Sequence, residues 1–405
     1  MDLSPEQADL SGPTVKDNTA PEGLLFQYAK DAKPLATPWQ VAVERAKLVR
    51  KMQIPKGVIL DPACGSGIQL AAYCAMMGRE GFGIELDEPT AKAAVANLRR
   101  VADQGFDSTL LESTIRVGDG TIGDDSKSIA MLHIDPARPR NSRTHGLEEM
   151  APQLPDIFSA WKDHLSEGER GPAILLDLSP RLVSDQRKQV ELMVEDFWPG
   201  IGKTWVWTSR GRGRVDRLSL WIGQLSSPGI SRRFIRIPPD MKDKPVIVEG
   251  DYTEISAWRR PPRKGDFVSL LDAALVESGL APTFFDKALP GQEIVWGITS
   301  GRRPQIHHPG EFEFTRSSDK LLVQASGKIV KLIHADINEE NLPLLIDAAR
   351  ELGFGKLTLR VQLDPEVQPR LQGSLDRQLA AKGGDLIGFV AKQPDDSMLL
   401  LCRIR

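Results

Sequence analysis

The sequence predicts an α/β protein in which an open, doubly wound sheet is followed by a smaller α+β region. Apolar runs typical of strands alternate with helical patterns between residues 58 and 178, the order expected of parallel strands joined by helices. Prolines and basic residues interrupt the pattern at Pro261-Pro-Arg-Lys-Gly265. We therefore expect a disordered tail over residues 1–20, the sheet domain over 21–260, a short connector over 261–304 and an α+β domain over 305–405.

The first strand of this sheet, Val58-Ile-Leu-Asp61, runs directly into a turn that contains Gly65 and Gly67. Because glycine has no Cβ atom, both positions can adopt positive φ and let backbone N–H groups approach a ligand closely. A helix is expected over residues 68–78. The turn has the spacing Asp-x-x-x-Gly-x-Gly and lacks the third glycine of the dinucleotide-binding fingerprint. It predicts a ligand site, and the strands that follow strengthen this prediction.

Each of the next three predicted strands, over residues 81–87, 113–119 and 129–135, also contains an acid at or near its end: Glu85, Asp119 and Asp135. Glu85 follows Gly67 by 18 residues, close to the spacing at which a carboxylate accepts hydrogen bonds from ribose hydroxyls. Taken singly, each acid is equally typical of an ordinary turn or helix cap. Because the carboxyl ends of parallel strands meet at one crevice, the four strand ends together predict one binding site.

A helix that begins at Pro38 precedes the first strand, and Thr37 is expected to cap it. Simple capping explains Thr37 about as well as a function does. Free N–H groups at a helix start also suit an anion, so Thr37 is in addition a candidate ligand contact.

The remaining elements follow the same patterns of apolar residues. In the sheet domain we expect helices over residues 157–165, 181–198 and 218–225 and strands over residues 173–178, 203–208 and 232–237. Beyond residue 260 we expect helices over residues 268–278, 342–352 and 367–380 and strands over residues 293–299, 328–333, 356–361, 386–390 and 398–404.

Almost the whole chain resembles the THUMP-like-domain class I S-adenosylmethionine (SAM) methyltransferases, and its glycine turn resembles that of THUMP-linked RNA guanine-N2 methyltransferases. The stretches that carry the resemblance are Asp61 to Gly67, Asp135-Pro-Ala-Arg138, Leu176 to Pro180, Trp205 to Leu225, Asp272 to Leu280 and Leu352 to Leu359. The resemblance implies a Rossmann-like class I methyltransferase sheet, a ferredoxin-like connector and a C-terminal THUMP-like domain. It also implies SAM as cofactor and tRNA or rRNA as partner.

The resemblance further implies a role for each candidate residue. The residues expected around SAM are Thr37, Asp61, Ala63, Cys64, Gly65, Gly67, Glu85 and Asp119. Asp135 and the carbonyl of Pro136 are expected to accept hydrogen bonds from an exocyclic amine and to aim its lone pair at the methyl group. Arg138 stands where amine methylases carry an aromatic residue, and a guanidinium can stack on a base or bind phosphate. His133 is not counted as a candidate, because a lone strand histidine more often packs than reacts.

Composition limits the possible partners. The formal net charge is −3, so nucleic-acid binding must come from local patches. The basic clusters are Arg210 to Arg214 with Arg217, Arg232-Arg233, Trp258 to Lys264 and Arg302-Arg303. Three cysteines without metal-ligand spacing, together with the lack of a long apolar run, favour a cytoplasmic protein that has no metal site and no membrane span.

Two alternatives to RNA base methylation stay open. The same core could methylate a small molecule or a protein, which the modest charge permits. A non-catalytic RNA-binding protein that still binds SAM is the other alternative, since the aromatic residue after Asp135-Pro136 is missing. The intact Asp61, Gly65, Gly67 and Glu85 argue against a loss of cofactor binding.

Overall fold

The computed structural model describes residues 1–29, 37–137, 146–255, 260–393 and 397–404. The chain forms two compact units, the first of Met1–Thr208 with Arg217–Ser231 and the second of Ser209–Asp216 with Arg232–Arg405. The main division therefore lies near residue 231 and not near residue 260, where the proline-rich stretch placed it.

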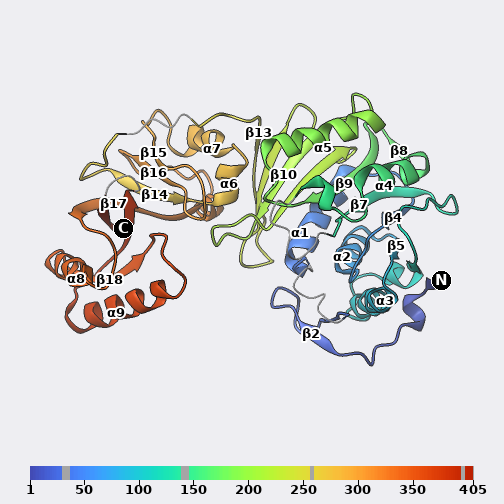
Figure 1. Ribbon diagram of the computed structural model, residues 1–405, viewed down its shortest axis with the longest axis horizontal. Coiled ribbons are helices and arrows are strands. Elements are labelled where there is room, and N and C mark those ends of the chain that lie inside the picture. Colours follow the sequence, from blue (N-terminus) through green and yellow to red (C-terminus); the bar gives the residue numbers. More distant parts are fainter. Residues whose placement is uncertain (30–36, 138–145, 256–259, 394–396, 405) are drawn as a thin grey trace. The chain divides into compact units, whose positions relative to one another are not determined.

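The sheet of the first unit has its strands in the order β6-β5-β4-β7-β9-β11-β10 (Figure 1). Their bounds are β4 Val58–Asp61, β5 Gly81–Glu85, β6 Thr114–Val117, β7 Ile129–Ile134, β9 Gly171–Leu178, β10 Lys203–Ser209 and β11 Arg217–Gly223. β4, β5, β6, β7 and β9 pair in parallel, whereas β11 is antiparallel to both β9 and β10. The doubly wound sheet is confirmed, and the carboxyl ends of its parallel strands share one edge.

β11 replaces the helix that was expected over residues 218–225, so that prediction is wrong. Leu218 to Ile222 are all buried, because the strand lies between β9 and β10 in the interior of the sheet. A strand buried on both faces shows an almost continuous apolar run, which periodicity cannot distinguish from a buried helix.

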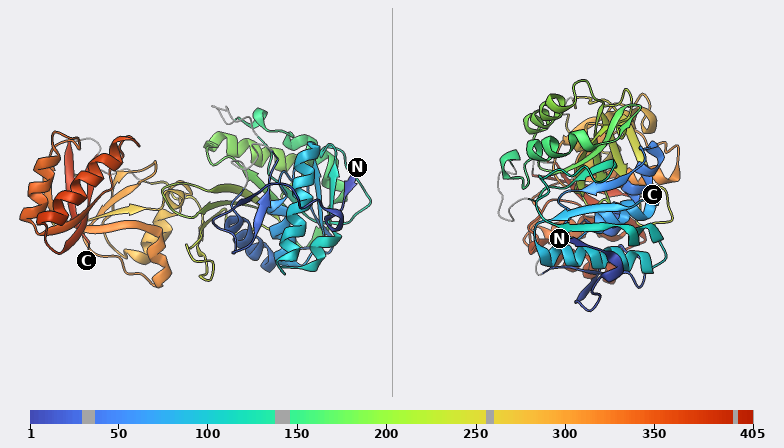
Figure 2. Two further views of the ribbon diagram at one scale, coloured as in Figure 1. Left: turned by 90° about the horizontal axis from the view of Figure 1, so that it is seen from below. Right: turned by 90° about the vertical axis from the view of Figure 1, so that its right-hand side faces the viewer.

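Helices cover both faces of this sheet (Figure 2). They are α1 Trp39–Val49, α2 Ile68–Met77 and α3 Glu88–Asp103, which pack together, and α4 Leu154–Trp161 and α5 Ser184–Phe197, which pack together. Neighbouring residues of β5 show the two faces. A Cβ atom at Gly83 would lie 3.0 Å from Leu70 of α2, whereas the Phe82 ring meets Trp161 of α4 edge-on, with centroids 6.3 Å apart.

Residues 1–20 belong to the first unit and do not form the disordered tail that was expected. β1 (Asp2–Leu3) pairs with the edge strand β6, and β2 (Thr14–Lys16) pairs with β3 (Leu25–Gln27). These pairings satisfy backbone groups of a segment whose polar composition by itself predicted no structure.

The segment after β2 also caps helix α1, which corrects the role predicted for Thr37. Asp17 Oδ2 accepts a hydrogen bond from Trp39 N at 2.8 Å, and Thr19 Oγ1 accepts one from Gln40 N at 3.1 Å. The helix begins at Trp39, so Thr37 is not its cap. Because these N–H groups are already paired, the start of α1 does not offer them to an anion.

The second unit contains a hairpin and a separate sheet. The hairpin consists of β12 (Arg232–Arg236) and β13 (Val246–Gly250). The sheet has the order β15-β16-β14-β17-β20-β19-β18. The bounds of its strands are β14 Phe267–Leu271, β15 Val295–Ile298, β16 Gln305–His308, β17 Val323–His334, β18 Phe354–Leu359, β19 Leu386–Gln393 and β20 Met398–Arg403.

The expected boundary between residues 304 and 305 lies inside this sheet, because β14 pairs with both β16 and β17. The helix predicted over residues 268–278 is wrong over its first part, which β14 occupies. Asp272 then caps the short α6 (Ala273–Glu277), accepting a hydrogen bond from Ala274 N at 2.8 Å. α7 (Ala281–Ala288) follows.

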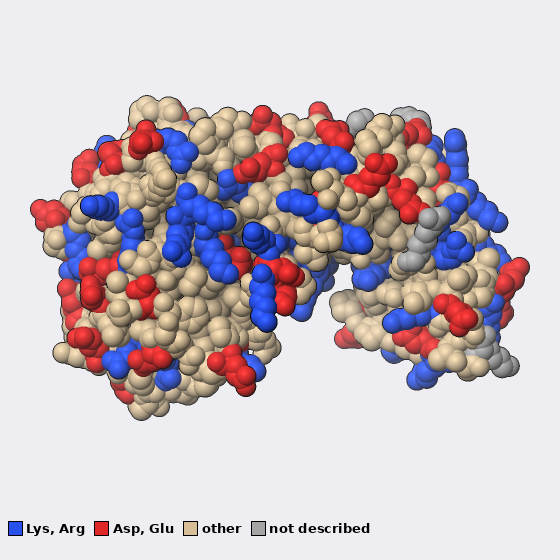
Figure 3. Space-filling view, turned by 180° about the vertical axis from the view of Figure 1, so that it is seen from behind, with Lys and Arg blue, Asp and Glu red and all other residues tan. Residues whose placement is uncertain are grey.

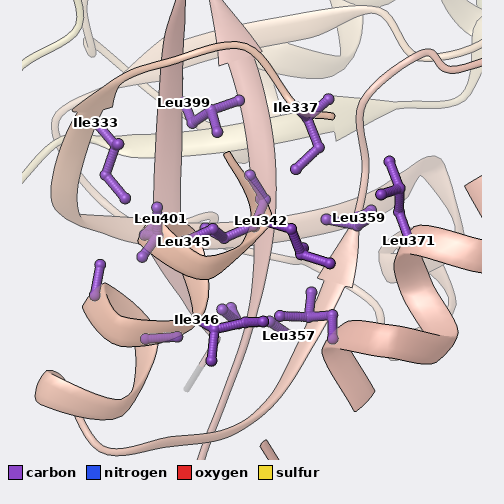
Figure 4. Close-up of a cluster of buried hydrophobic side chains, with 14 of the residues drawn as sticks. Ile333, Ile337, Leu342, Leu345, Ile346, Leu357, Leu359, Leu371, Leu399 and Leu401 are labelled. Atoms are coloured by element: carbon purple, nitrogen blue, oxygen red, sulfur yellow. The ribbon is translucent and has the colours of Figure 1, made fainter. Parts of the chain in front are cut away.

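The C-terminal part of this unit has the predicted α+β order, β17-α8-β18-α9-β19-β20. α8 (Leu342–Glu351) and α9 (Val367–Lys382) supply one side of a buried apolar cluster, and the strands supply the other. Figure 4 shows Leu345 and Leu371 from the helices among Leu357 and Leu401 from the strands. Across both units, no helix in the described ranges is long and apolar enough to cross a membrane.

Candidate active site

The turn between β4 and α2 is held by its own backbone and by the next strand. Gly67 N donates to the carbonyl of Cys64 at 2.8 Å, and Cys64 N donates to the carbonyl of Ile84 at 3.0 Å. Gly65 and Gly67 have positive φ, of 53° and 69°. A Cβ atom at Gly67 would lie 2.9 Å from Ala94 Cβ of α3, whereas one at Gly65 would meet nothing within 4 Å. Gly67 is therefore required for packing, and Gly65 leaves the backbone open toward a ligand.

Glu85 lies beside this turn, as its spacing from Gly67 predicted. Its Oε2 accepts a hydrogen bond from Gly65 N at 3.0 Å, and its Oε1 accepts one from Asp87 N at 3.0 Å. Burial of the side chain raises the pKa of Glu85, although these two backbone N–H groups oppose the shift. The half-buried carboxylate is thus positioned to accept hydrogen bonds from hydroxyl groups of a ligand.

Asp119 is exposed beyond the end of β6, the strand that pairs with β5. Gly118 N donates to the backbone carbonyl of Glu85 at 3.0 Å. Hydrogen bonds from Thr121 N and Oγ1, at 2.9 and 2.7 Å, lower the pKa of Asp119. Asp119 also lines a surface pocket of about 520 Å³ with Ile84. The glycine turn and Glu85 come together directly, whereas Asp119 lines a pocket to which neither the turn nor Glu85 contributes.

Asp61 and Cys64 are buried beneath the turn. Asp61 Oδ1 accepts a hydrogen bond from Ala63 N at 3.2 Å, which fixes the first residues after β4. Burial raises the pKa of the Cys64 thiol well above its usual range. Cys64 and Ala63 therefore contribute backbone geometry to the site, and the Cys64 thiol is protonated at neutral pH.

His133 of β7 joins Asp61 to β9. Its Nδ1 lies 2.7 Å from Asp61 Oδ2, and its Nε2 lies 3.2 Å from Asp177 Oδ2. Burial by itself would lower the pKa of His133, but the two carboxylates outweigh burial and raise it to about 9. The imidazole is therefore protonated at neutral pH and donates from both nitrogens. The sequence did not predict that His133 connects Asp61 with Asp177.

Arg45 of α1 supplies a second positive charge beside Asp177. Its guanidinium pairs with Asp177 through two contacts, of 2.6 and 2.9 Å, and Ser219 Oγ donates to Asp177 Oδ1 at 2.7 Å. Burial would raise the pKa of Asp177, but Arg45 and His133 hold it well below its usual range. Two buried anions and two buried cations thus form a neutral network, which avoids the large penalty of an unpaired buried charge.

Asp135, just after β7, is tied to this network through Gln69 of α2. Gln69 Oε1 accepts a hydrogen bond from Arg45 Nη1 at 3.1 Å, so its Nε2 faces the other way and donates to Asp135 Oδ2 at 2.7 Å. Arg217 Nη2 lies 3.6 Å from the same oxygen and also donates to Thr37 Oγ1. Asp135 Oδ1 has no hydrogen-bond partner among the described residues. One oxygen is fixed, and the other is available to a ligand.

Two further candidates follow Asp135. Pro136 is buried, and Ala137 exchanges backbone hydrogen bonds with Ala151 at 3.0 and 2.9 Å, which anchors the chain after β7. Arg138 lies outside the described residues. Gln69 and Arg45 were not predicted from the sequence, and Arg217 was assigned to a basic cluster and not to the surroundings of Asp135. Gln69 lies 66 residues from Asp135, and Arg45 lies 132 residues from Asp177, so spacing along the chain does not indicate these contacts.

We expect the stability of the first unit to fall as pH rises from 6.5 to 9. The pKa of His133 is higher in the folded protein, about 9, than the ordinary 6.5, so its stabilising charge is fully present below 6.5 and is lost as pH rises through 9. The shift corresponds to a loss on the order of 3 kcal/mol. Urea unfolding at pH 6.5, 7.5 and 9 measures it, with His133→Gln as the variant in which this dependence disappears. A free energy of unfolding that stays level across this range in the parent protein would rule out a protonated His133.

Comparisons with known proteins establish the fold. No protein-family model and no curated protein sequence matches the chain. A protein from Porphyromonas gingivalis W83, provisionally described as a methyltransferase, is similar over 93% of this chain and 83% of its own, with a TM-score of 0.57 and 15% identity. A protein from Listeria monocytogenes, provisionally described as a class I SAM-dependent methyltransferase, covers 53% of this chain and 69% of its own, with a TM-score of 0.35 and 13% identity. The second likeness is too weak to add to the first. The first unit has the Rossmann-like fold of class I methyltransferases.

Proposed function

We propose that the protein is a SAM-dependent methyltransferase that methylates an exocyclic amine of a base in tRNA or rRNA. The observation that carries this proposal is the Asp135 carboxylate at the carboxyl edge of the sheet, whose Oδ2 is held while Oδ1 has no partner among the described residues. The fold supports methyl transfer, and the acidic strand ends support a nucleoside-containing cofactor.

The residues of the glycine turn suit SAM. Gly65 has positive φ and open space where a Cβ atom would be, so a ligand can approach its backbone. Glu85 offers carboxylate oxygens beside that turn, and Asp119, near which the adenine amine is expected, lines a pocket beyond the end of the neighbouring strand β6. When bound, SAM supplies an electrophilic methyl group on its sulfonium.

Asp135 then acts on the acceptor. The nitrogen lone pair of an exocyclic amine is delocalised into the base, and hydrogen bonds from the amine to Oδ1 and to the Pro136 carbonyl favour its pyramidal form. Gln69 and Arg217 hold Oδ2, which fixes the direction in which Oδ1 points. The rate gain comes chiefly from this alignment, as expected for an in-line displacement.

We further propose that the second unit serves RNA recognition and that its C-terminal α+β part is the THUMP-like module. The predicted β17-α8-β18-α9-β19-β20 order supports this assignment. A cytoplasmic location suits the three buried cysteines, which are all free thiols.

Gln69→Leu is expected to lower kcat by about 10- to 100-fold while leaving SAM affinity unchanged. The variant keeps the side-chain volume but removes the hydrogen bond to the charged Asp135 Oδ2, an interaction worth about 1.5–3 kcal/mol. Steady-state turnover at saturating SAM and RNA, together with calorimetric SAM binding, separates the two effects. An unchanged kcat would show that Asp135 needs no positioning by Gln69.

The direct test of the proposal uses purified protein with SAM labelled on its methyl group and separate RNA, protein and metabolite fractions of a cell extract. We expect label in tRNA or rRNA. Label in the protein or metabolite fraction would assign a different acceptor to the same core. SAM binding without transfer to any fraction would favour a non-catalytic protein.

A further inference from the structure

Arginines from three distant segments of the chain meet in the second unit. The loop Ser209–Asp216 belongs to this unit, and its Gly213 packs directly on Arg302. A Cβ atom at Gly213, where φ is 69°, would lie 2.3 Å from the Arg302 carbonyl oxygen and 3.0 Å from Arg302 Cβ. Arg212 and Arg214, which flank Gly213, therefore lie beside Arg302.

Arg303 and Arg360 extend this group. Arg303 Nη1 donates to the carbonyl of Val361, the residue after Arg360, which holds Arg303 against the end of β18. Burial lowers the pKa of Arg303, and the positive charges of Arg360 and Arg302 lower it further. The Nε atom of Arg360 is buried without a hydrogen-bond partner. The guanidinium groups of Arg302 and Arg360 are thus close enough to Arg303 to repel its positive charge.

Acidic partners are scarce at this group. Asp216 pairs with Arg210 at 2.9 Å and with Arg214 at 3.5 Å. In the ranges that the structure describes, no carboxylate pairs with Arg212, Arg302, Arg303 or Arg360. On the face that Figure 3 shows, acidic and basic side chains lie side by side over much of the surface, although basic side chains also gather in places. Like charges held together without counter-ions destabilise a fold, so this arrangement favours an anionic ligand.

We propose that Arg212, Arg214, Arg302, Arg303 and Arg360, here called the arginine cluster, bind the phosphate backbone of the RNA substrate. This inference rests on the proposed function and assigns its RNA contact to particular residues. A guanidinium presents a planar fork that pairs with phosphate oxygens through two hydrogen bonds. Five such groups on three segments exceed what a single phosphate requires, so a chain of phosphates suits the cluster better than a free ion. Because the protein carries a net charge of −3, such local attraction is what RNA binding requires.

Point variants test this proposal better than a truncation that removes the C-terminal residues 305–405. Removal of residues 305–405 would take β16 and β17 away from β14 and expose the core of the whole sheet. The triple variant Arg212→Gln, Arg302→Gln and Arg360→Gln leaves the strands intact. The matched control, Lys356→Gln, Arg370→Gln and Arg377→Gln, removes the same charge from exposed positions of the same unit.

The measurement is RNA affinity by fluorescence anisotropy across a series of salt concentrations, on full-length protein. For the cluster variant we expect affinity to fall by at least about tenfold and the slope of log affinity against log salt to decrease by about 2, the value for three lost phosphate contacts. The control should retain affinity and slope, and SAM affinity should be unchanged in both. If the triple variant unfolds, the single variant Arg302→Gln, at an exposed position, replaces it in the same measurement. For this variant we expect the slope of log affinity against log salt to decrease by about 0.7.

Each other outcome overturns a distinct statement. Unchanged RNA affinity and slope in the cluster variants, with the parent protein binding RNA, would overturn the cluster assignment and leave the proposed function standing. Competition by millimolar inorganic phosphate alone would indicate a single-ion site and not a backbone site. A parent protein that binds SAM but no RNA would contradict the RNA substrate itself.

Discussion

Gly67→Val is expected to reduce SAM affinity by at least about 100-fold, or about 2.7 kcal/mol. The residue has φ of 69°, a conformation that β-branched side chains avoid, and its Cβ atom would lie 2.9 Å from Ala94 Cβ and 3.1 Å from Leu98 Cδ1. The turn must therefore move away from α3, which displaces Gly65 N from Glu85. Isothermal titration calorimetry of the folded variant measures the loss.

Gly200→Val is the matched control. Gly200 has nearly the same backbone angle, φ 72°, but nothing lies within 4 Å of the position of its Cβ atom. The control carries the same backbone strain without the steric clash, so its SAM affinity should equal that of the parent. A folded Gly67→Val protein that binds SAM as tightly as the parent would remove the glycine turn from the cofactor site.

Asp135→Ala is expected to lower kcat by about 100-fold or more and to keep SAM affinity within a few-fold. Asp135 contacts Gln69 and Arg217 and not the glycine turn, so its loss removes acceptor positioning and leaves the cofactor residues in place. Single-turnover methyl transfer with saturating SAM measures the chemical step. Asp185→Ala, which changes an exposed acid of the same unit, is the control and should keep full activity.

Asp135→Asn sharpens this prediction. Gln69 Nε2 and Arg217 Nη2 are both donors, so they select the amide oxygen of an asparagine and turn its NH₂ group toward the acceptor. A donor facing the amine cannot accept its hydrogen bonds, and we therefore expect Asn to be about as impaired as Ala. If Asp135→Asn is nearly as active as the parent protein, the Asp135 side chain does not accept hydrogen bonds from the amine.

The local parts of the site were predictable from the sequence. An apolar strand, an acid and two glycines within ten residues predict the turn at Gly65 and Gly67, because glycine readily adopts the positive φ angles that such a turn requires. The position of Glu85 follows from the length of one strand–helix unit. In the structure, Glu85 Oε2 accepts a hydrogen bond from Gly65 N.

The buried network was not predictable in this way. His133 is protonated because Asp61 and Asp177 lie near the ends of the strands on either side of β7, and strand order cannot be read from spacing alone. The orientation of Gln69 depends on Arg45, which comes from a helix outside the strand pattern. Such roles arise from contacts between segments that are distant in sequence.

Two errors in the fold have related causes. The interior strand β11 resembles a helix because both of its faces are buried. Residues 1–20 look polar and unpatterned, yet Asp17 caps a helix 22 residues away, and β1 pairs with β6. In both cases the surrounding structure decides the conformation.

The most direct test of the central claim is the identity of the methylated nucleoside. RNA incubated with the parent protein and SAM that carries a deuterated methyl group would be digested to nucleosides and analysed by tandem mass spectrometry, beside a reaction with Asp135→Ala. We expect a deuterated methyl group on an exocyclic base nitrogen in the parent reaction and almost none with the variant. A deuterated methyl on ribose or on a ring carbon, or equal labelling by both proteins, would contradict amine methylation positioned by Asp135.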